Sequence, residues 1–213
     1  MQGSTFRALL GIALCGCLIA LGGCSNHLPG LSVATPVTLT AAQAANVTIT
    51  LGDLPSDYRL AQDQTPNNAQ LAQLLGQPSA TLILTQLGRT GGSYRVFTFV
   101  APEPSVVNAT VRATIEVDIF DTPPHAQAWE MALQSIASGS THPLNVAAPG
   151  QVHHVRLQSF QAGDIAATTT TLTDAEGNTV VTITTNFVGP NVSLADAERF
   201  AAIIDNRILH PGA

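Results

Sequence analysis

The stretch Thr110–Phe120, with the sequence TVRATIEVDIF, decides the fold class of this chain. Apolar residues alternate with polar or charged residues along its whole length, and this period of two is typical of a β-strand with one buried face and one wet face. The apolar set is Val111, Ala113, Ile115, Val117 and Ile119. Such a strand predicts an antiparallel sheet that is covered on one side only.

The hydrophobic period changes directly after this strand. Thr122 is a suitable helix N-cap, Pro123 suits the first helical position, and apolar residues then recur at helical spacing until Gly139. The residues of this stripe are Ala126, Trp129, Leu133, Ile136 and Ala137. Because the single tryptophan, Trp129, belongs to the stripe, we expect it in the core and not on a binding surface.

The C-terminal third predicts three further strands. Residues 165–173 and 179–188 are rich in β-branched residues and flank the turn-forming segment 174–178, which indicates a β-hairpin. Residues 151–160 predict the strand that precedes this hairpin.

A last helix is predicted from Ser193 to Leu209. Ser193 followed by Asp196 three residues later resembles a capping box. The apolar residues that follow have helical spacing and form one stripe: Leu194, Ala197, Phe200, Ala201, Ile204 and Ile208. We expect this stripe to close the core over the buried face of the sheet.

The segment between residues 47 and 100 predicts the remaining elements. They are a strand at 47–51, a helix from Pro66 to Gly76, strands at 81–87 and 93–100, and a loop at 88–92. Together the elements predict an α+β domain, a mainly antiparallel sheet with helices packed on one face. Over residues 47–209 their order resembles the PsbP-like α/β sandwich of small exported lipoproteins, and this resemblance implies a binding or accessory module.

The N-terminus has the pattern of an export signal. Arg7 precedes the apolar run Ala8–Ala20, which is shorter than the ~20 residues of a membrane-spanning helix. The sequence Leu21-Gly22-Gly23-Cys24 then resembles the lipobox of bacterial lipoproteins. The resemblance implies that residues 1–23 are a cleaved signal peptide and that Cys24 is lipidated with acyl chains such as palmitate. The alternative is an ordinary secretory signal that happens to contain a cysteine.

Lipidation of Cys24 limits the chemistry of the mature chain. Cys15 and Cys17 lie in the leader, so Cys24 is the only cysteine of the mature chain, and its sulfur carries the lipid. This predicts neither a disulfide nor a thiolate nucleophile. Two or three acyl chains suffice for stable attachment to a membrane. In a two-membrane cell, an aspartate after the cysteine resembles the signal that retains a lipoprotein in the inner membrane. Ser25 stands at this position instead and favours the outer membrane. In a single-membrane cell the protein is expected on the outer face of the cell membrane.

Residues 24–46 are expected to be a lipidated cysteine and a flexible tether, because Pro, Ser, Thr, Ala and Gly dominate and no apolar period persists. The alternative is that residues 37–39 add an edge strand to the domain. The single domain is expected at residues 47–209, followed by a tail at 210–213.

The charge balance excludes one class of partner. Charged residues make up only 10% of the chain. Without the leader and its Arg7, seven arginines face fourteen acidic residues, a formal charge of −7. Such a surface repels nucleic acid, whose binding depends on phosphate neutralisation. No nucleic-acid function is expected.

No catalytic, cofactor or metal site is predicted. His153 and His154 are adjacent on a predicted strand and point to opposite faces. Glu116 and Asp118 share the predicted wet face, where solvated carboxylates are the expected interpretation, with Arg112 on the same face. The segment 174–178 lacks the register of a calcium loop and is explained by a turn.

Two functional classes therefore remain. The first is a non-enzymatic binding or accessory lipoprotein of the cell envelope, with an envelope protein or a glycan as partner. Its surface would be the threonine-rich sheet face formed by 168–171 and 182–185, or the loops 88–92 and 141–150. The second is an envelope hydrolase or other enzyme whose carboxylate or histidine site has no recognisable motif.

Overall fold

The computed structural model describes residues 37–100, 108–136, 140–145, 152–162, 165–189 and 194–211. Its helices are η1 (Ala41–Gln43), α1 (Ala44–Val47), η2 (Leu51–Asp53), α2 (Asn68–Leu74), α3 (Ala80–Gln86), α4 (Pro123–Ile136) and α5 (Ala195–Leu209). Its strands are β1 (Tyr58–Gln64), β2 (Arg89–Phe99), β3 (Ala109–Phe120), β4 (Ser140–Asn145), β5 (Val152–Ala162), β6 (Ile165–Glu176) and β7 (Thr179–Gly189). The predicted leader, Cys24 and Ser193 lie outside the described residues.

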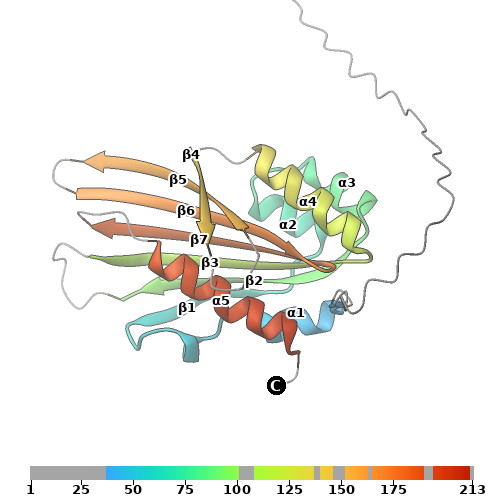
Figure 1. Ribbon diagram of the computed structural model, residues 1–213, viewed down its shortest axis with the longest axis horizontal. Coiled ribbons are helices and arrows are strands. Elements are labelled where there is room, and N and C mark those ends of the chain that lie inside the picture. Colours follow the sequence, from blue (N-terminus) through green and yellow to red (C-terminus); the bar gives the residue numbers. More distant parts are fainter. Residues whose placement is uncertain are drawn as a thin grey trace, which may run out of the picture. The chain divides into compact units, whose positions relative to one another are not determined.

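The strands form one seven-stranded sheet in the order β1-β2-β3-β7-β6-β5-β4 (Figure 1). Every pair of neighbours is antiparallel. The decisive strand β3 lies inside the sheet, between β2 and β7. The prediction of an α+β fold with an antiparallel sheet is confirmed.

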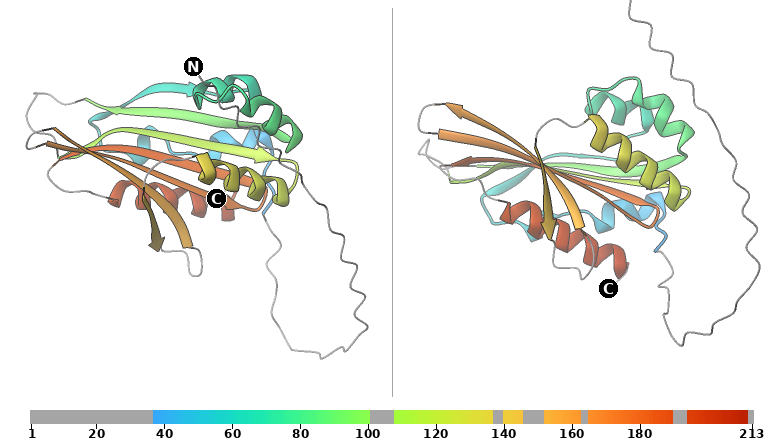
Figure 2. Two further views of the ribbon diagram at one scale, coloured as in Figure 1. Left: turned by 90° about the horizontal axis from the view of Figure 1, so that it is seen from above. Right: turned by 45° about the horizontal axis from the view of Figure 1, so that its top comes forward.

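One face of the sheet is covered by α5 and α1 (Figure 2). The apolar residues of β3 point to this face, as their alternation predicts. The larger apolar cluster forms here, and α5 contributes Phe200, Ala201, Ile204 and Ile208 to it. Phe200 is 1% exposed and Ile204 is fully buried. The predicted role of the C-terminal helix in closing the core is confirmed.

The opposite face is covered in part by α2, α3 and α4 (Figure 2). Trp129 of α4, 1% exposed, packs there with Phe120 at the end of β3 and Val180 of β7. The expectation that helices pack on one face is therefore wrong. The sheet has a second apolar patch at one end, and three amphipathic helices bury their apolar sides against it.

Three segments between residues 58 and 92 differ from the sequence prediction. Residues 81–87 form most of helix α3, not a strand: Ala80 and Leu84, four residues apart, are buried, whereas Leu82 is 63% exposed. The predicted loop 88–92 is a turn at Gly88 followed by the start of β2. β1 was not predicted, since it is an edge strand whose residues are almost all exposed.

The domain begins earlier than expected. Leu39 is 2% exposed and Ala44 is fully buried in the larger apolar cluster, so residues 37–46 belong to the folded unit and not to the tether. Asn178 secures this segment, because its side chain both accepts from the backbone N–H of Leu39 and donates to its carbonyl, each over 2.8 Å. The expected strand at 47–51 is not formed: Val47 ends α1, residues 48–50 connect the two helices, and Leu51 begins η2.

Candidate functional site

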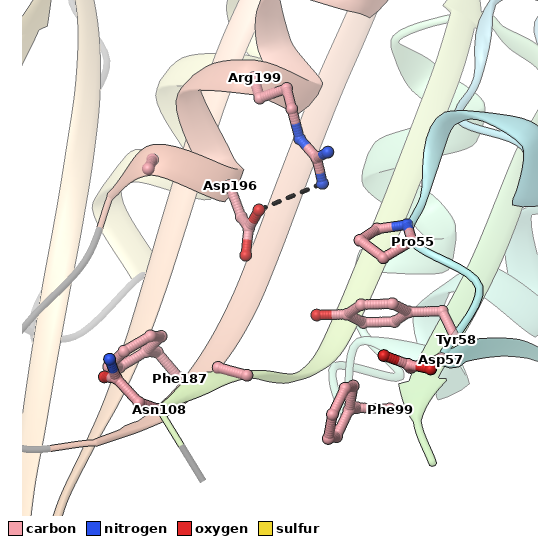
Figure 3. Close-up of a pocket in the computed structure, with 10 residues that line it drawn as sticks. Pro55, Asp57, Tyr58, Phe99, Asn108, Phe187, Asp196 and Arg199 are labelled. Carbon is pink, nitrogen blue, oxygen red and sulfur yellow. Dashed lines mark hydrogen bonds and ion pairs between the residues drawn. The ribbon is translucent and has the colours of Figure 1, made fainter. Parts of the chain in front are cut away.

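An open pocket of about 470 Å³ lies where the ends of β1, β2, β3 and β7 meet the first turn of α5 (Figure 3). Strand register brings its residues together. Tyr58 at the start of β1 pairs with Phe99 at the end of β2, and Phe187 of β7 pairs with Thr110 near the start of β3. The volume falls within the range of roughly 300–1,000 Å³ that small-molecule sites occupy.

Three aromatic rings line this pocket. The rings of Tyr58 and Phe99 meet edge to face, with centroids 5.5 Å apart. The hydroxyl of Tyr58 donates to the carbonyl of Thr110 over 2.5 Å, which fixes the orientation of the ring. Phe187 lies across the hollow from these two rings (Figure 3). The pocket therefore presents rigid apolar surfaces on two sides.

Polar side chains complete the rim. Asp196 and Arg199, one turn apart on α5, form an ion pair over 3.2 Å above the hollow (Figure 3). Asn108 lies beside Phe187, and Asp57 precedes Tyr58; both are exposed. Two carboxylates, one amide and one guanidinium thus surround the rings, and they offer both donors and acceptors to a ligand.

The phenol of Tyr58 stays neutral across the physiological range. Burial raises the pKa of Tyr58 to about 12, and the negative charge of Asp196 adds to the shift. A phenol with such a pKa does not act as a general base near neutral pH. Its contribution to the pocket is its ring.

The carboxylates of the pocket lack the environment of a glycosidase pair. Catalysis of this kind needs one carboxyl group that desolvation keeps protonated near neutral pH. Asp57 is exposed, and Asp196 is paired with the guanidinium of Arg199.

Glu116 and Asp118 are not solvated, so that expectation is wrong. They are 3% and 1% exposed on the face that α2, α3 and α4 cover. Nε of Arg89 donates to Oδ1 of Asp118 over 2.7 Å, and Nη1 of Arg89 donates to the carbonyl of Pro66 over 2.9 Å. Gly92 makes room for this ion pair, because a Cβ there would collide with both side chains.

The buried position of Glu116 changes its titration. Complete burial raises the pKa of Glu116 well above its usual range, and the neighbouring carboxylate of Asp118 raises it further. The raised pKa favours the neutral form of Glu116, while Asp118 forms the ion pair with Arg89. We interpret these three residues as a structural ion cluster inside the domain.

The remaining predicted residues are dispersed. The threonine stretches alternate between faces: Thr168, Thr170 and Thr185 are buried, whereas Thr171 and Thr184 are half-buried on the face that also carries α4. The turn at 174–178 has a structural role through Asn178. Within the described part of the chain, no three His, Cys, Asp or Glu side chains gather in a way that could hold a metal ion.

The described histidine side chains add no site. His153 and His154 belong to β5, but their side chains lie outside the described residues. Of the predicted loop 141–150, residues 141–145 belong to β4 and residues 146–150 lie outside the described residues. Nδ1 of His125 lies 2.6 Å from Oδ1 of Asp121, one turn apart at the exposed start of α4.

Sequence reasoning missed the aromatic pocket. Tyr58, Phe99 and Phe187 are far apart in the chain, and only the strand pairing makes them neighbours. The available signal was the scarcity of aromatic residues, 5% of the chain, together with the position of Phe99 and Phe187 at the ends of predicted strands. Strand ends of one antiparallel sheet meet at a common edge, so aromatic residues there were candidates for a shared site.

The comparisons with known proteins leave function open. No protein-family model matches the chain, and no curated protein matches it in sequence. The crystal structure of the extracellular domain of PknH from Mycobacterium tuberculosis matches 81% of this chain and 97% of that one, at 12% identity and a TM-score of 0.49. A crystal structure from Bacteroides thetaiotaomicron matches 70% of this chain and 41% of that one, at 13% identity and a TM-score of 0.40. No function follows from either likeness.

Within the described ranges, no helix has both the length and the hydropathy that are needed to cross a membrane.

Proposed function

We propose that this protein is a lipid-anchored, extracytoplasmic binding module of a bacterial cell envelope that holds a saccharide of an envelope glycan in the pocket between β1, β2, β7 and α5. One observation carries the proposal: three aromatic rings, two of them held edge to face, and four hydrogen-bonding side chains line one open pocket.

The chemistry of a sugar fits this combination of residues. A pyranose ring presents C–H groups on its faces, which pack on the electron-rich face of an aromatic ring. Its hydroxyls point outward from the ring edge and need donors and acceptors, which Asn108, Asp57, Asp196 and Arg199 supply. Because Tyr58 and Phe99 are held against each other, little side-chain entropy is lost when a ligand binds.

The charges of the pocket and of the whole chain argue against an anionic ligand. The pocket has two carboxylates against one guanidinium, and that guanidinium is already paired with Asp196. The chain carries a formal charge of −6, its leader included. A nucleotide or a polyphosphate would meet net repulsion, whereas a neutral saccharide would not.

The lipid anchor is a separate part of the proposal and is supported by the lipobox-like sequence Leu21-Gly22-Gly23-Cys24. Changing Cys24 to Ala should abolish the incorporation of labelled palmitate and release the protein from the membrane fraction. The measurement is metabolic labelling followed by fractionation of the producing cells. A Cys24→Ala protein that is still acylated contradicts the anchor.

The saccharide site is tested with the full chain purified in detergent. Tetrasaccharides of glucose, galactose, mannose, arabinose and N-acetylglucosamine are added, and binding is followed by ligand-observed NMR. At least one should bind, and Arg199→Ala or Asn108→Ala should weaken it about tenfold, as expected for the loss of one or two hydrogen bonds in a binding site.

Arg59→Ala is the matched control for this experiment. Arg59 is an exposed arginine on β1 outside the pocket, so its removal should leave saccharide affinity unchanged. Equal weakening by Arg59→Ala and Arg199→Ala would indicate a nonspecific charge effect. Release of shorter saccharides during the incubation would favour a hydrolase over a binding module.

A further inference from the structure

A second hollow, of about 320 Å³, lies on the other side of the sheet, on the face that carries α2 and α4. Its floor is made of threonines from two adjacent strands: Thr169, Thr171 and Thr173 of β6 and Thr182 and Thr184 of β7. We call these five residues the threonine groove. None of them lines the aromatic pocket, so the two sites are independent.

The hydroxyls of the threonine groove form two rows. Alternate residues of a strand point to the same face, and Thr171 pairs with Thr184 while Thr173 pairs with Thr182. The hydroxyl oxygens of Thr171 and Thr184 are 3.4 Å apart. Along each strand the hydroxyls therefore recur every two residues, about 6.8 Å. The main-chain groups of an extended peptide that face one side recur at this same distance.

Within the described part of the chain, one hydroxyl of the groove and one carboxyl oxygen beside it have no hydrogen-bond partner. Among the described residues, Oγ1 of Thr182 is buried and has no hydrogen-bond partner. Glu116 does not line the groove but pairs with Thr182 across β3 and β7; it is 3% exposed, and its Oε1 is likewise unpartnered within the described part of the chain. Such groups are rare in folded proteins, and a bound ligand is one way to satisfy them.

The walls of the groove select for a neutral ligand with an apolar group. Leu75 after α2 and Leu133 of α4 form one wall, and Leu133 is 7% exposed. Among the described residues no acidic side chain lines the groove, and the one guanidinium that does, that of Arg156, donates to the carbonyl of Gln134. An apolar side chain of the ligand fits against the two leucines while its main chain lies over the hydroxyls.

We propose that the threonine groove binds a neutral peptide segment in extended conformation, parallel to β6 and β7, with one apolar side chain against Leu75 and Leu133. The hydroxyls bind main-chain groups, so the groove accepts many sequences that share this chemistry. This site goes beyond the saccharide pocket and does not depend on it.

The test uses the full chain in detergent and a defined probe. The probe is a library of acetylated and amidated pentapeptides in which Ala, Val, Leu and Thr occupy every position, and fluorescence-labelled members report binding by anisotropy. Thr171→Val with Thr184→Val removes two hydroxyls while keeping β-branched strand residues. The double variant should bind the best peptide at least about tenfold more weakly, since each lost hydrogen bond costs a few-fold in affinity.

The matched control is Thr98→Val. Thr98 lies on the same face in β2, is half-buried and does not line the groove, so this variant should bind within about twofold of the wild type. If the double variant melts earlier than the wild type, Gln158→Ala gives the same test from an exposed rim residue.

Three results would overturn the proposal. The first is that no member of the library binds. The second is that the double variant and Gln158→Ala both bind the peptide as well as the wild type does, and the third is that the saccharide of the aromatic pocket displaces the peptide. Failure of saccharide binding alone leaves the peptide result unaffected, because the two pockets share no residue.

Discussion

The two faces of the sheet are stabilised in different ways. On the face beneath α1 and α5, apolar residues of five strands meet an apolar helix stripe, and Phe200 and Ile204 fill the centre. On the face beneath α2, α3 and α4, a smaller apolar cluster around Trp129 lies beside an ion pair, Arg89 with Asp118, whose side chains are each 1% exposed.

This difference shows that one strand can serve two kinds of core. β3 supplies Ile115 and Val117 to the apolar face and Glu116 and Asp118 to the other. Burial of charge costs free energy unless a partner and hydrogen bonds compensate, and Arg89 supplies both to Asp118. The contribution of the apolar face to stability should therefore not depend on pH, whereas that of the charged face should.

The largest expected effect concerns the apolar face. Phe200→Ala should lower the free energy of unfolding by about 3–5 kcal/mol, because a fully buried phenylalanine leaves a large cavity. Chemical denaturation of the two proteins measures this difference. If α5 were instead a detachable arm that docks a partner, the Phe200→Ala curve would coincide with that of the wild type.

An effect of similar size is expected on the charged face, for another reason. Arg89→Ala leaves the buried carboxylate of Asp118 without its counter-ion and should cost about 3–5 kcal/mol. Arg89→Met combined with Asp118→Leu removes both charges and should recover most of that loss. Denaturation curves for the single and double variants decide the matter; a double variant as unstable as Arg89→Ala would show that packing, not charge, dominates there.

The pH dependence of stability provides a third, smaller effect. The folded-state pKa of Glu116 is raised above its unfolded value, so the stability from its neutral form is complete below about pH 4 and is lost as the pH rises through the folded-state pKa. The slope is at most about 1.4 kcal/mol per pH unit. The glutamine of Glu116→Gln cannot ionise, so the free energy of unfolding of this variant should increase relative to that of the wild type as the pH rises. Unfolding curves that differ by a constant amount at every pH would refute this assignment.

The smallest expected effect concerns the surface of α5. Arg199→Ala removes an ion pair whose side chains are 41% and 35% exposed, together with a contact 5.0 Å above the Phe200 ring. Exposed pairs contribute about 0.2–1 kcal/mol, so the melting curve should shift little. A loss as large as that of Phe200→Ala would mean that the rim of the pocket is part of the core.

The parts of the fold that the sequence predicted are those whose pattern is local. The alternation in Thr110–Phe120, the hairpin around 174–178 and the stripes of α4 and α5 all depend on neighbouring residues, and the structure has each of them. Trp129 was expected in the core for the same reason and is buried.

The parts that were not predicted depend on distant residues. The charged residues of β3 indicated a solvent-exposed face. Their burial could not be predicted, because the counter-ion of Asp118 is Arg89, which is 29 residues away in sequence. The segment 37–46 looked like a tether because its anchoring residue, Asn178, is 139 positions from Leu39. The same holds for the aromatic pocket, whose rings come from β1, β2 and β7 and become neighbours only through strand pairing.

The saccharide pocket is tested most directly through the two tyrosines of the chain. Tyr58 lines the pocket, whereas Tyr94 is buried on the other face of the sheet and pairs with Glu116. With ¹³C-labelled tyrosine, the ring resonances of both residues can be followed while the best tetrasaccharide is added to the full chain. We expect the chemical shift of the Tyr58 ring to change in a saturable manner and that of the Tyr94 ring to stay constant. A saccharide that binds and shifts Tyr94 alone, or neither tyrosine, would contradict the proposed saccharide site.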